Sequence, residues 1–517
     1  MEKVNKFTQL FRFLRSFLPL QLLFSHVKYN LIALIYWIFL LLIVSDKVGY
    51  AFGIPILFYS PEYLGEVSTI SFGLLGFAFG GFIMAFNTYS YIKLGPKYPF
   101  LVLIHQPFFK FCKNNSIIPL TFLIYYLIKM SVFQRTEEFA SIFEITTFCF
   151  SFIGGVFLFL ILSILYFFPM SKRKGIKRPS IDQGNETQPI ESIIHRNKTR
   201  WYHQFLRNKN KTYIYVGNGF KFMKSRSIRH IKTDLIEQIL SQNRFNTTIF
   251  ELLTILTFVI LGLFSSYKLF EMPAAMSIVL LITMILMLFS ALQSWFGKWT
   301  YALVILVIVG MNFLSLNTSY FTFKNFAYGL NYSSENIPQY SVQQIKKSSL
   351  IGLPKIDSYG NYIETLENWK KNTGEERPKL IILNTSGGGS RSALWTFGVL
   401  QKIDQETGGK LHSYLHLMTG ASGGMIGAAY FRELVLRSKR NSIQDLYDAS
   451  YRDKLGKDLL NKLSFSATTN DIFFRYQKIK YNGHEYLKDR GYAFEEQLHE
   501  NTDYFMNHTL GYYTNYE

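Results

Sequence analysis

The feature that most limits how this chain can fold is a series of apolar runs in its first three-fifths. A helix needs about 20 mostly apolar residues to cross the hydrocarbon core of a bilayer. Candidate runs are Leu31–Val44 with its flanks, Ser68–Phe86, Ser116–Phe133, Ile145–Phe168, Thr248–Phe264, Ala274–Leu292 and Thr300–Leu316. We therefore predict a multi-pass α-helical membrane region over residues 1–316, with about seven spans.

The segment before the first run has a different character. Phe7–Val27 mixes Phe and Leu with Arg12 and Arg15. Charges of this kind suit a helix that lies in the membrane interface better than one that spans it. No small-residue cleavage site follows a compact apolar core, so a cleavable signal peptide is not expected.

Lysine and arginine alternate between rich and poor loops, and this alternation predicts orientation. The rich segments precede Leu31, cover 93–113 and cover the basic loop 171–246, whereas the loops holding Lys47 and Arg135 carry one cation each. This pattern predicts an N-terminus inside and four spans before the basic loop. Three further spans would place the C-terminal region outside, but the loops near Lys268 and Lys298 carry almost no charge bias, so its side rests on the span count.

The composition restricts the partners. The chain carries a formal charge of +20, although only 17% of its 517 residues are charged and 49% are hydrophobic. Such a charge suits either nucleic acid or an anionic membrane surface. Because no nucleic-acid-binding module is recognisable, we expect membrane lipids as partners and no nucleic acid. The sequence does not indicate an oligomeric state.

A polar linker, 317–378, separates the membrane region from the rest. It contains no apolar run of spanning length, and Tyr359–Lys371 is predicted to form a short helix. The turn-rich end of this linker, 371–378, marks a domain boundary ahead of a strand.

The first of two glycine-rich turns follows this boundary. Leu380–Leu383 reads as a strand buried on both faces, Gly387, Gly388 and Gly389 form the turn, and Ser392–Thr407 has the apolar face of a helix. Free N–H groups at such a helix N-terminus bind anions, either a phosphate or the oxyanion of an acyl-transfer intermediate. Dinucleotide binding remains open for this turn alone, and the pattern of a P-loop is not met.

The second turn has the form G-x-S-x-G. Leu411–Met418 supplies a strand-like run, Gly420 to Gly424 the turn, and Gly424–Arg437 a helix. Ser422 is placed at the corner, where the small residues Gly420 and Gly424 remove clashes around a nucleophile held in a strained conformation. The pattern therefore predicts a serine nucleophile at the carboxyl edge of a sheet.

This pair of turns resembles the patatin-like phospholipase family, whose motifs are D-G-G-G-x-R-G and G-x-S-x-G. The first reads Ser386-Gly387-Gly388-Gly389-Ser390-Arg391-Ser392 here, so that serines replace the leading acid and the last glycine. The resemblance implies a patatin-like α/β hydrolase domain in 379–517, in which Ser422 is the nucleophile. It also implies that Gly387, Gly388 and Gly389 form the oxyanion hole and that Arg391 supports their loop.

The general base of that family has no clear counterpart. The resemblance implies an aspartate in D-G-G or D-G-A, and no Asp-Gly follows Ser422. The aspartates available are Asp445, Asp448, Asp453, Asp458, Asp471, Asp489 and Asp503, with Asp489 expected to cap or pair locally. Alternatively, a triad histidine lies among His412, His416, His484, His499 and His508. Because no closing strand is visible before Glu517, we expect a domain that is incomplete at its C-terminus.

Three functions follow from these observations. The first is a membrane-anchored serine acyl hydrolase that cleaves lipid esters without cofactor or metal. The second is a non-catalytic membrane or lipid-binding protein with a decayed hydrolase unit, which the missing aspartate motif favours. The third is a nucleotide-binding module, against which the missing acidic residue of a dinucleotide fingerprint speaks.

Overall fold

The computed structural model describes residues 13–173, 211–226, 249, 251–257, 260, 263–264, 270–317, 341–351, 358–471, 477–481, 483–508 and 510–513. The chain divides into two compact units. The membrane unit comprises Met1–Thr322 and Ser464–Phe473, and the C-terminal unit comprises Phe323–Leu463 and Phe474–Glu517.

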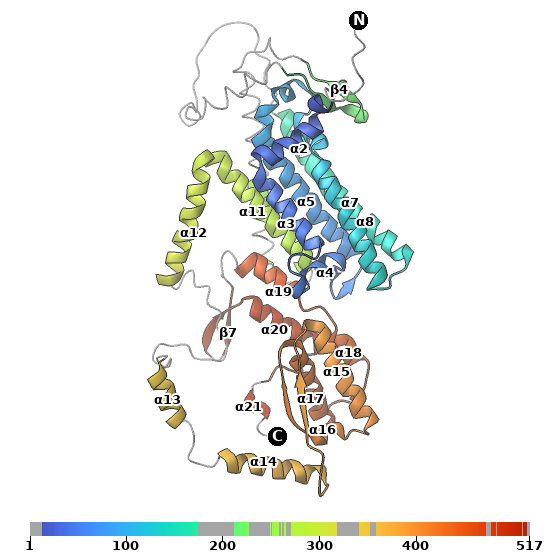
Figure 1. Cartoon of the computed structure of the whole chain (residues 1–517), viewed down its shortest axis with the longest axis vertical. Helices are drawn as coiled ribbons and strands as arrows, with labels where there is room; N and C mark the ends of the chain where they lie inside the picture. Colours follow the sequence, from blue (N-terminus) through green and yellow to red (C-terminus); the bar gives the residue numbers. More distant parts are fainter. Residues whose placement is uncertain are drawn as a thin grey trace. The chain divides into compact units, whose positions relative to one another are not determined.

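The membrane unit is helical (Figure 1). Its longer helices are α2 (Leu18–Tyr29), α3 (Leu31–Val44), α5 (Thr69–Leu94), α7 (Ile117–Thr136), α8 (Ile142–Arg173), α11 (Ala274–Phe296) and α12 (Thr300–Asn317). Its shorter elements are η1 (Tyr50–Phe52), α4 (Ile54–Tyr59), η2 (Gly95–Lys97), η3 (Pro99–Leu103), α6 (Pro107–Asn114) and η7 (Gly297–Trp299), with the β-hairpins β1 (Glu62–Tyr63)–β2 (Glu66–Val67) and β3 (Ile214–Val216)–β4 (Phe222–Lys224), the latter closed by η5 (Asn218–Phe220).

Several of these helices fit a bilayer. Within the described part of the chain, α5, α7, α8, α11 and α12 are each long and apolar enough to cross a membrane. The short helix α3 meets this test only together with α2, from which it is bent by 97°. These helices indicate a membrane protein, as predicted. The predicted span Thr248–Phe264 is described only in separate pieces, and most of the basic loop 171–246 lies outside the described residues, so the count of seven and the orientation stay predictions.

Glycines bring α5 and α8 into backbone contact. A Cβ added at Gly76 would lie 2.0 Å from the carbonyl oxygen of Phe152, and one at Gly155 would lie 2.0 Å from that of Gly73. Small residues allow such close approach between membrane helices, whose association depends on packing. Figure 1 shows α5, α7 and α8 side by side. Buried aromatic rings fill the space around them, including Trp37, Phe79, Phe82, Phe122 and Tyr126.

The bend between α2 and α3 coincides with a buried polar cluster. Asn30 lies between the two helices with φ −135° and ψ 42°, a conformation that ends the helical hydrogen bonding. Its amide contacts His26 at 3.0 Å, and the His26 ring in turn contacts Asn115 at 2.7 Å. Buried polar groups need such partners. Residues 7–12 of the predicted interfacial segment are outside the described part, and its location in the membrane interface stays a prediction.

A segment from late in the sequence belongs to the membrane unit. Helix α19 (Asn461–Ser466) leads into a π-helical stretch, η8 (Ala467–Asp471). Phe465 is 1% exposed and belongs to the same apolar core as the membrane helices. The membrane unit is therefore completed by residues that the sequence analysis assigned to the C-terminal domain.

The C-terminal unit contains a two-stranded parallel sheet with helices. Its elements are α13 (Val342–Ile351), α14 (Ser358–Thr373), β5 (Ile381–Thr385), α15 (Gly389–Glu406), α16 (Leu411–Tyr414), β6 (Leu415–Gly420), α17 (Ser422–Lys439), α18 (Ser450–Leu455), β7 (Lys478–Tyr481), β8 (His484–Leu487), α20 (Arg490–Asn501) and α21 (Leu510–Tyr513). Strands β7 and β8 form a separate antiparallel hairpin. The helix predicted at Tyr359–Lys371 is confirmed as α14. Strands are few in the described residues.

Two predictions about the strands are wrong. The strand β5 is not buried on both faces, because Ile382 is 50% exposed and its parallel neighbour Leu417 is 47% exposed. In β5, only Ile381 and Leu383 pack on the core beneath α15 and α17, as Leu415 and Met418 do in β6. The run Leu411–Met418 is also not one strand, since its first four residues form α16. Apolar periodicity alone does not separate a short helix from a strand.

The core of this unit lies between α15 and α17. Phe397, Tyr430 and Phe431 are fully buried there. A Cβ added at Gly427 would lie 2.2 Å from the carbonyl oxygen of Ala393, so the two helices pack backbone to backbone. This packing fixes the relative position of the two helix N-termini, each of which follows one glycine-rich turn.

Candidate active site

The two glycine-rich turns lie side by side at one edge of the parallel sheet. In the register of β5 and β6, Thr385 is opposite Gly420, so both strands end at the same level. The Ala421 N–H donates to the Thr385 carbonyl at 3.3 Å and extends the pairing past the last residue of β6. Parallel strands with helical crossovers place their carboxyl ends, and hence their turns, together in this way.

Ser422 lies at the corner between β6 and α17. Ala421 is still extended, with φ −134° and ψ 144°, and Ser422 then has φ 52°. A non-glycine residue rarely adopts positive φ, and such conformations are concentrated at functional sites. Ser422 is exposed, whereas Gly423 and Gly424 behind it are buried. The arrangement is the one that the G-x-S-x-G pattern predicts.

The glycines of the second turn contact the backbone of the first. A Cβ added at Gly423 would lie 1.9 Å from the carbonyl oxygen of Gly389, and one at Gly424 would lie 2.4 Å from that of Ser386. A Cβ added at Gly387 would lie 3.3 Å from the Ser422 Cβ and 3.9 Å from its Oγ. No larger residue fits at Gly423 or Gly424 without moving the first turn. The glycine triplet and Ser422 thus form one constellation.

Ser386 and Ser392, which replace two residues of the patatin-like motif, are joined by a hydrogen bond. The Ser392 hydroxyl donates to the Ser386 carbonyl at 2.7 Å. This hydrogen bond ties the residue before the glycine triplet to the N-terminal end of α15. The same hydroxyl would lie 3.2 Å from a Cβ at Gly424. Sequence reasoning treated both serines only as departures. The sequence signal for this hydrogen bond was the spacing of six residues between Ser386 and Ser392. At that spacing, a side chain early in a helix can reach back to the loop before the helix.

Two helix N-termini converge on this place. Helix α15 begins at Gly389 and α17 begins at Ser422. The first N–H groups of a helix have no partner within the helix, and the helix dipole adds a positive potential at this end. Two such ends beside one exposed hydroxyl favour a negative charge next to Ser422. This is the electrostatic requirement of an oxyanion site.

Arg391 follows the glycine turn by two residues. It is exposed on the first turn of α15 and lines a groove between α15 and α18. Its predicted role in supporting the loop therefore has no visible contact among the described residues, and the Ser392 hydrogen bond holds the loop instead.

The candidate aspartates have other partners. Asp445 accepts from the Tyr447 N–H, Asp448 from the Ser450 N–H, Asp458 from the Leu460 and Asn461 N–H groups, and Asp489 from the Tyr492 N–H, while Asp503 pairs with Lys454. The expected local capping role of Asp489 is confirmed at the start of α20. Asp453 lines the α15–α18 groove, and Asp471 belongs to the membrane unit. Among the described residues, none of these carboxylates is hydrogen-bonded to Ser422.

The histidines are also placed elsewhere. His412 contacts Lys439, His416 packs on Tyr362 and Trp369, His484 on Tyr486, His499 on Tyr504 and His508 on Tyr512. In the part of the chain that the structure describes, Ser422 and the glycine turn come together, and no aspartate or histidine is hydrogen-bonded to Ser422.

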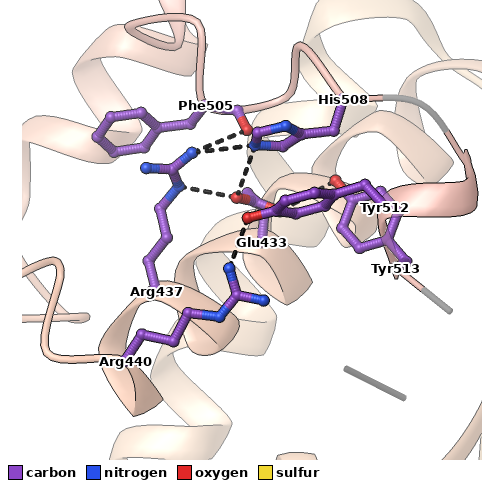
Figure 2. A network of polar contacts seen from close by, with 7 residues as sticks. All are labelled: Glu433, Arg437, Arg440, Phe505, His508, Tyr512 and Tyr513. Carbon is purple, nitrogen blue, oxygen red and sulfur yellow. Dashed lines mark hydrogen bonds and ion pairs between the residues drawn. The ribbon is translucent and has the colours of Figure 1, made fainter. Parts of the chain in front are cut away.

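A polar network braces the far half of α17 (Figure 2). Glu433 is only 2% exposed and accepts from Arg437 at 2.7 Å and from the Tyr513 hydroxyl at 3.0 Å. Arg437 also donates to the Phe505 carbonyl and contacts His508, each at 3.3 Å. Burial and the hydrogen bond to Glu433 raise the pKa of Tyr513 to about 12. The network anchors α17 against the C-terminal segment, which steadies the helix that carries Ser422.

Comparison with known protein families, curated proteins and solved structures finds no match to this chain.

Proposed function

We propose that this protein is a membrane-anchored serine acyl hydrolase of the patatin-like type, acting on ester bonds of membrane lipids. The observation that carries the proposal is Ser422, exposed at φ 52° at the start of α17 and in contact with the glycine turn 387–389. A serine at a strand-to-helix corner beside free N–H groups is suited to nucleophilic attack on an ester carbonyl.

The chemistry follows from this geometry. The Ser422 oxygen attacks the carbonyl carbon, and the N–H groups of Gly387, Gly388 and Gly389 stabilise the oxyanion of the tetrahedral intermediate. Collapse expels the alcohol and leaves an acyl-serine, which water hydrolyses to free acid. The proton of Ser422 passes to a base and then to the leaving alcohol. The resemblance implies an aspartate for this role, and no described aspartate has that position.

The membrane unit gives this activity a context. Its long apolar helices would hold the hydrolase unit at the surface where lipid esters are found. We place the N-terminus inside on loop charge, and the hydrolase unit outside if seven spans are present.

The alternative is a lipid-binding protein without catalysis, which the separation of Ser422 from every described aspartate and histidine favours. Release of fatty acid from phospholipid in mixed detergent micelles by the full chain decides between them. We expect release by the wild type, none by Ser422→Ala and full release by Ser413→Ala, a control serine in α16. Release that persists in Ser422→Ala would exclude the proposed nucleophile, and no release by folded wild type would support the alternative.

A further inference from the structure

A groove in the C-terminal unit has no part in the chemistry proposed above. It lies between α15 and α18 and has a volume of about 880 Å³. Pockets of this size hold small organic molecules or headgroups. The side chains that give it its character are Arg391, Leu394, Trp395, Lys402, Arg452 and Asp453.

The α15 side of the groove is a single stripe of the helix. Arg391, Trp395 and Lys402 follow one another at spacings of four and seven residues, which place them on one helix face. From Arg391 to Lys402 the stripe is about 16 Å long at 1.5 Å per residue. Its N-terminal end is two residues from Gly389, so the groove begins beside the candidate active site.

The second helix packs against this stripe. A Cβ added at Gly398 would lie 3.9 Å from the Cδ of Arg452, and one at Gly456 would lie 3.7 Å from a methyl group of Leu394. The aliphatic stem of Arg452 thus crosses α15 at a residue without a side chain. Arg452 also lines the groove and adds a second guanidinium to it.

The charges of the groove are unequal. Three cations line it, against the single carboxylate of Asp453. Lys402 also pairs with Glu406, but both side chains are about two-thirds exposed, at 66% and 67%, and such a pair is worth little in water. Within the described residues, Arg391 and Arg452 have no ion pair. Each guanidinium presents a planar fork of N–H donors that matches phosphate oxygens.

An exposed indole ring lies between these cations. Trp395 is 75% exposed and Leu394 is 38% exposed. Tryptophan is enriched where protein meets the interfacial region of a bilayer, because its ring is amphipathic. Cations beside it are attracted to an anionic membrane surface.

We propose that the α15–α18 groove is an interfacial lipid site, in which Arg391, Lys402 and Arg452 bind the phosphates of anionic phospholipids while Trp395 enters the interface. The occupant is a bilayer surface because the chain itself has helices that suit a membrane, and because the exposed ring and the cations lie on one stripe. This inference does not depend on hydrolysis by Ser422.

The test is an environment-sensitive fluorophore at residue 395. In a chain with Cys112→Ser and Cys149→Ser, Trp395→Cys is labelled with a nitrobenzoxadiazole group and the whole protein is reconstituted in nanodiscs. Gln405→Cys, on the same helix but outside the groove, is the matched control. We expect the emission at 395 to rise severalfold and shift to the blue in phosphatidylcholine–phosphatidylglycerol discs compared with phosphatidylcholine alone, with no change at 405.

Charge variants complete the test. Lys402→Gln with Arg452→Gln should abolish the rise at 395, whereas Lys379→Gln with Lys410→Gln, which removes the same charge elsewhere, should keep it. Both pairs retain long side chains, so the packing at Gly398 is preserved. A signal at 395 that does not depend on anionic lipid, equals that at 405 or survives the groove substitutions would overturn the proposal.

Discussion

Two adjacent glycines in α8 offer a sharp test of how the membrane unit is packed. Gly155 is buried against α5, where an added Cβ would lie 2.0 Å from the Gly73 carbonyl oxygen and 2.8 Å from the Phe77 nitrogen. Gly154 is exposed, with nothing within 4 Å of an added Cβ. Alanine at either position gains the same helix propensity, about 1 kcal/mol relative to glycine. The difference between the two variants therefore reports the clash alone.

The size of this clash follows from the distances. A close carbon–oxygen contact is about 3.3 Å, so Gly155→Ala requires α5 and α8 to separate by about 1 Å. Overpacking of this kind costs about 1–3 kcal/mol. At about 2–4 °C per kcal/mol for a unit of this size, the thermal midpoint of Gly155→Ala should lie about 2–12 °C below that of Gly154→Ala.

The assay uses the chain's own cysteines. Cys112 and Cys149 are free and half-buried in the membrane unit, so a thiol-reactive fluorogenic dye reports their exposure on heating the detergent-solubilised protein. Equal midpoints for the two variants would refute the close α5–α8 contact. A lower midpoint for Gly154→Ala than for Gly155→Ala would place the opposite face of α8 against α5.

Three further predictions concern the C-terminal unit. Ser392→Ala removes the hydrogen bond that closes the glycine turn, worth about 1 kcal/mol, and should slow ester hydrolysis about fivefold relative to Ser390→Ala. Glu433→Ala leaves Arg437 without its buried carboxylate and should cost about 3 kcal/mol, seen as faster hydrogen exchange in the second half of α17. Burial lowers the pKa of His499, so the unfolded state takes up this proton first as pH falls below the ordinary value of about 6.5. Stability of α20 to proteolysis should accordingly fall between neutral pH and pH of about 5.5, and less so in His499→Gln.

For each of these three predictions, a specific result would contradict the reasoning. Equal hydrolysis rates in the two serine variants would show that the glycine turn keeps its shape without Ser392. Unchanged exchange in Glu433→Ala would show that the network in Figure 2 does not brace α17. A proteolysis profile that is the same with and without His499 would assign the acid sensitivity to another group.

Patterns with a strict local cause were predictable from the sequence. The long apolar runs predict α5, α7, α8, α11 and α12, because a span needs a fixed number of apolar residues. The G-x-S-x-G pattern predicts the corner at Ser422, because only small neighbours tolerate it. The helix α14 in the linker was also predicted from its own residues, Tyr359–Lys371.

Features that depend on distant residues were not predictable. The exposure of Ile382 depends on what covers the sheet, which a run of four apolar residues does not specify. The insertion of Phe465 into the core of the membrane unit joins residues far apart in the chain. No general base is assigned from the described residues either, because none of their aspartates or histidines is hydrogen-bonded to Ser422.

The most direct test of the central claim is reaction of the full-length protein with a fluorophosphonate, followed by mass mapping of the adduct. This reagent reacts with serines that are both nucleophilic and adjacent to an oxyanion site. We predict one adduct, on Ser422, that is absent in Ser422→Ala. An adduct on another residue, labelling that persists in Ser422→Ala, or no reaction of the folded wild type would contradict the assignment of Ser422 as the nucleophile.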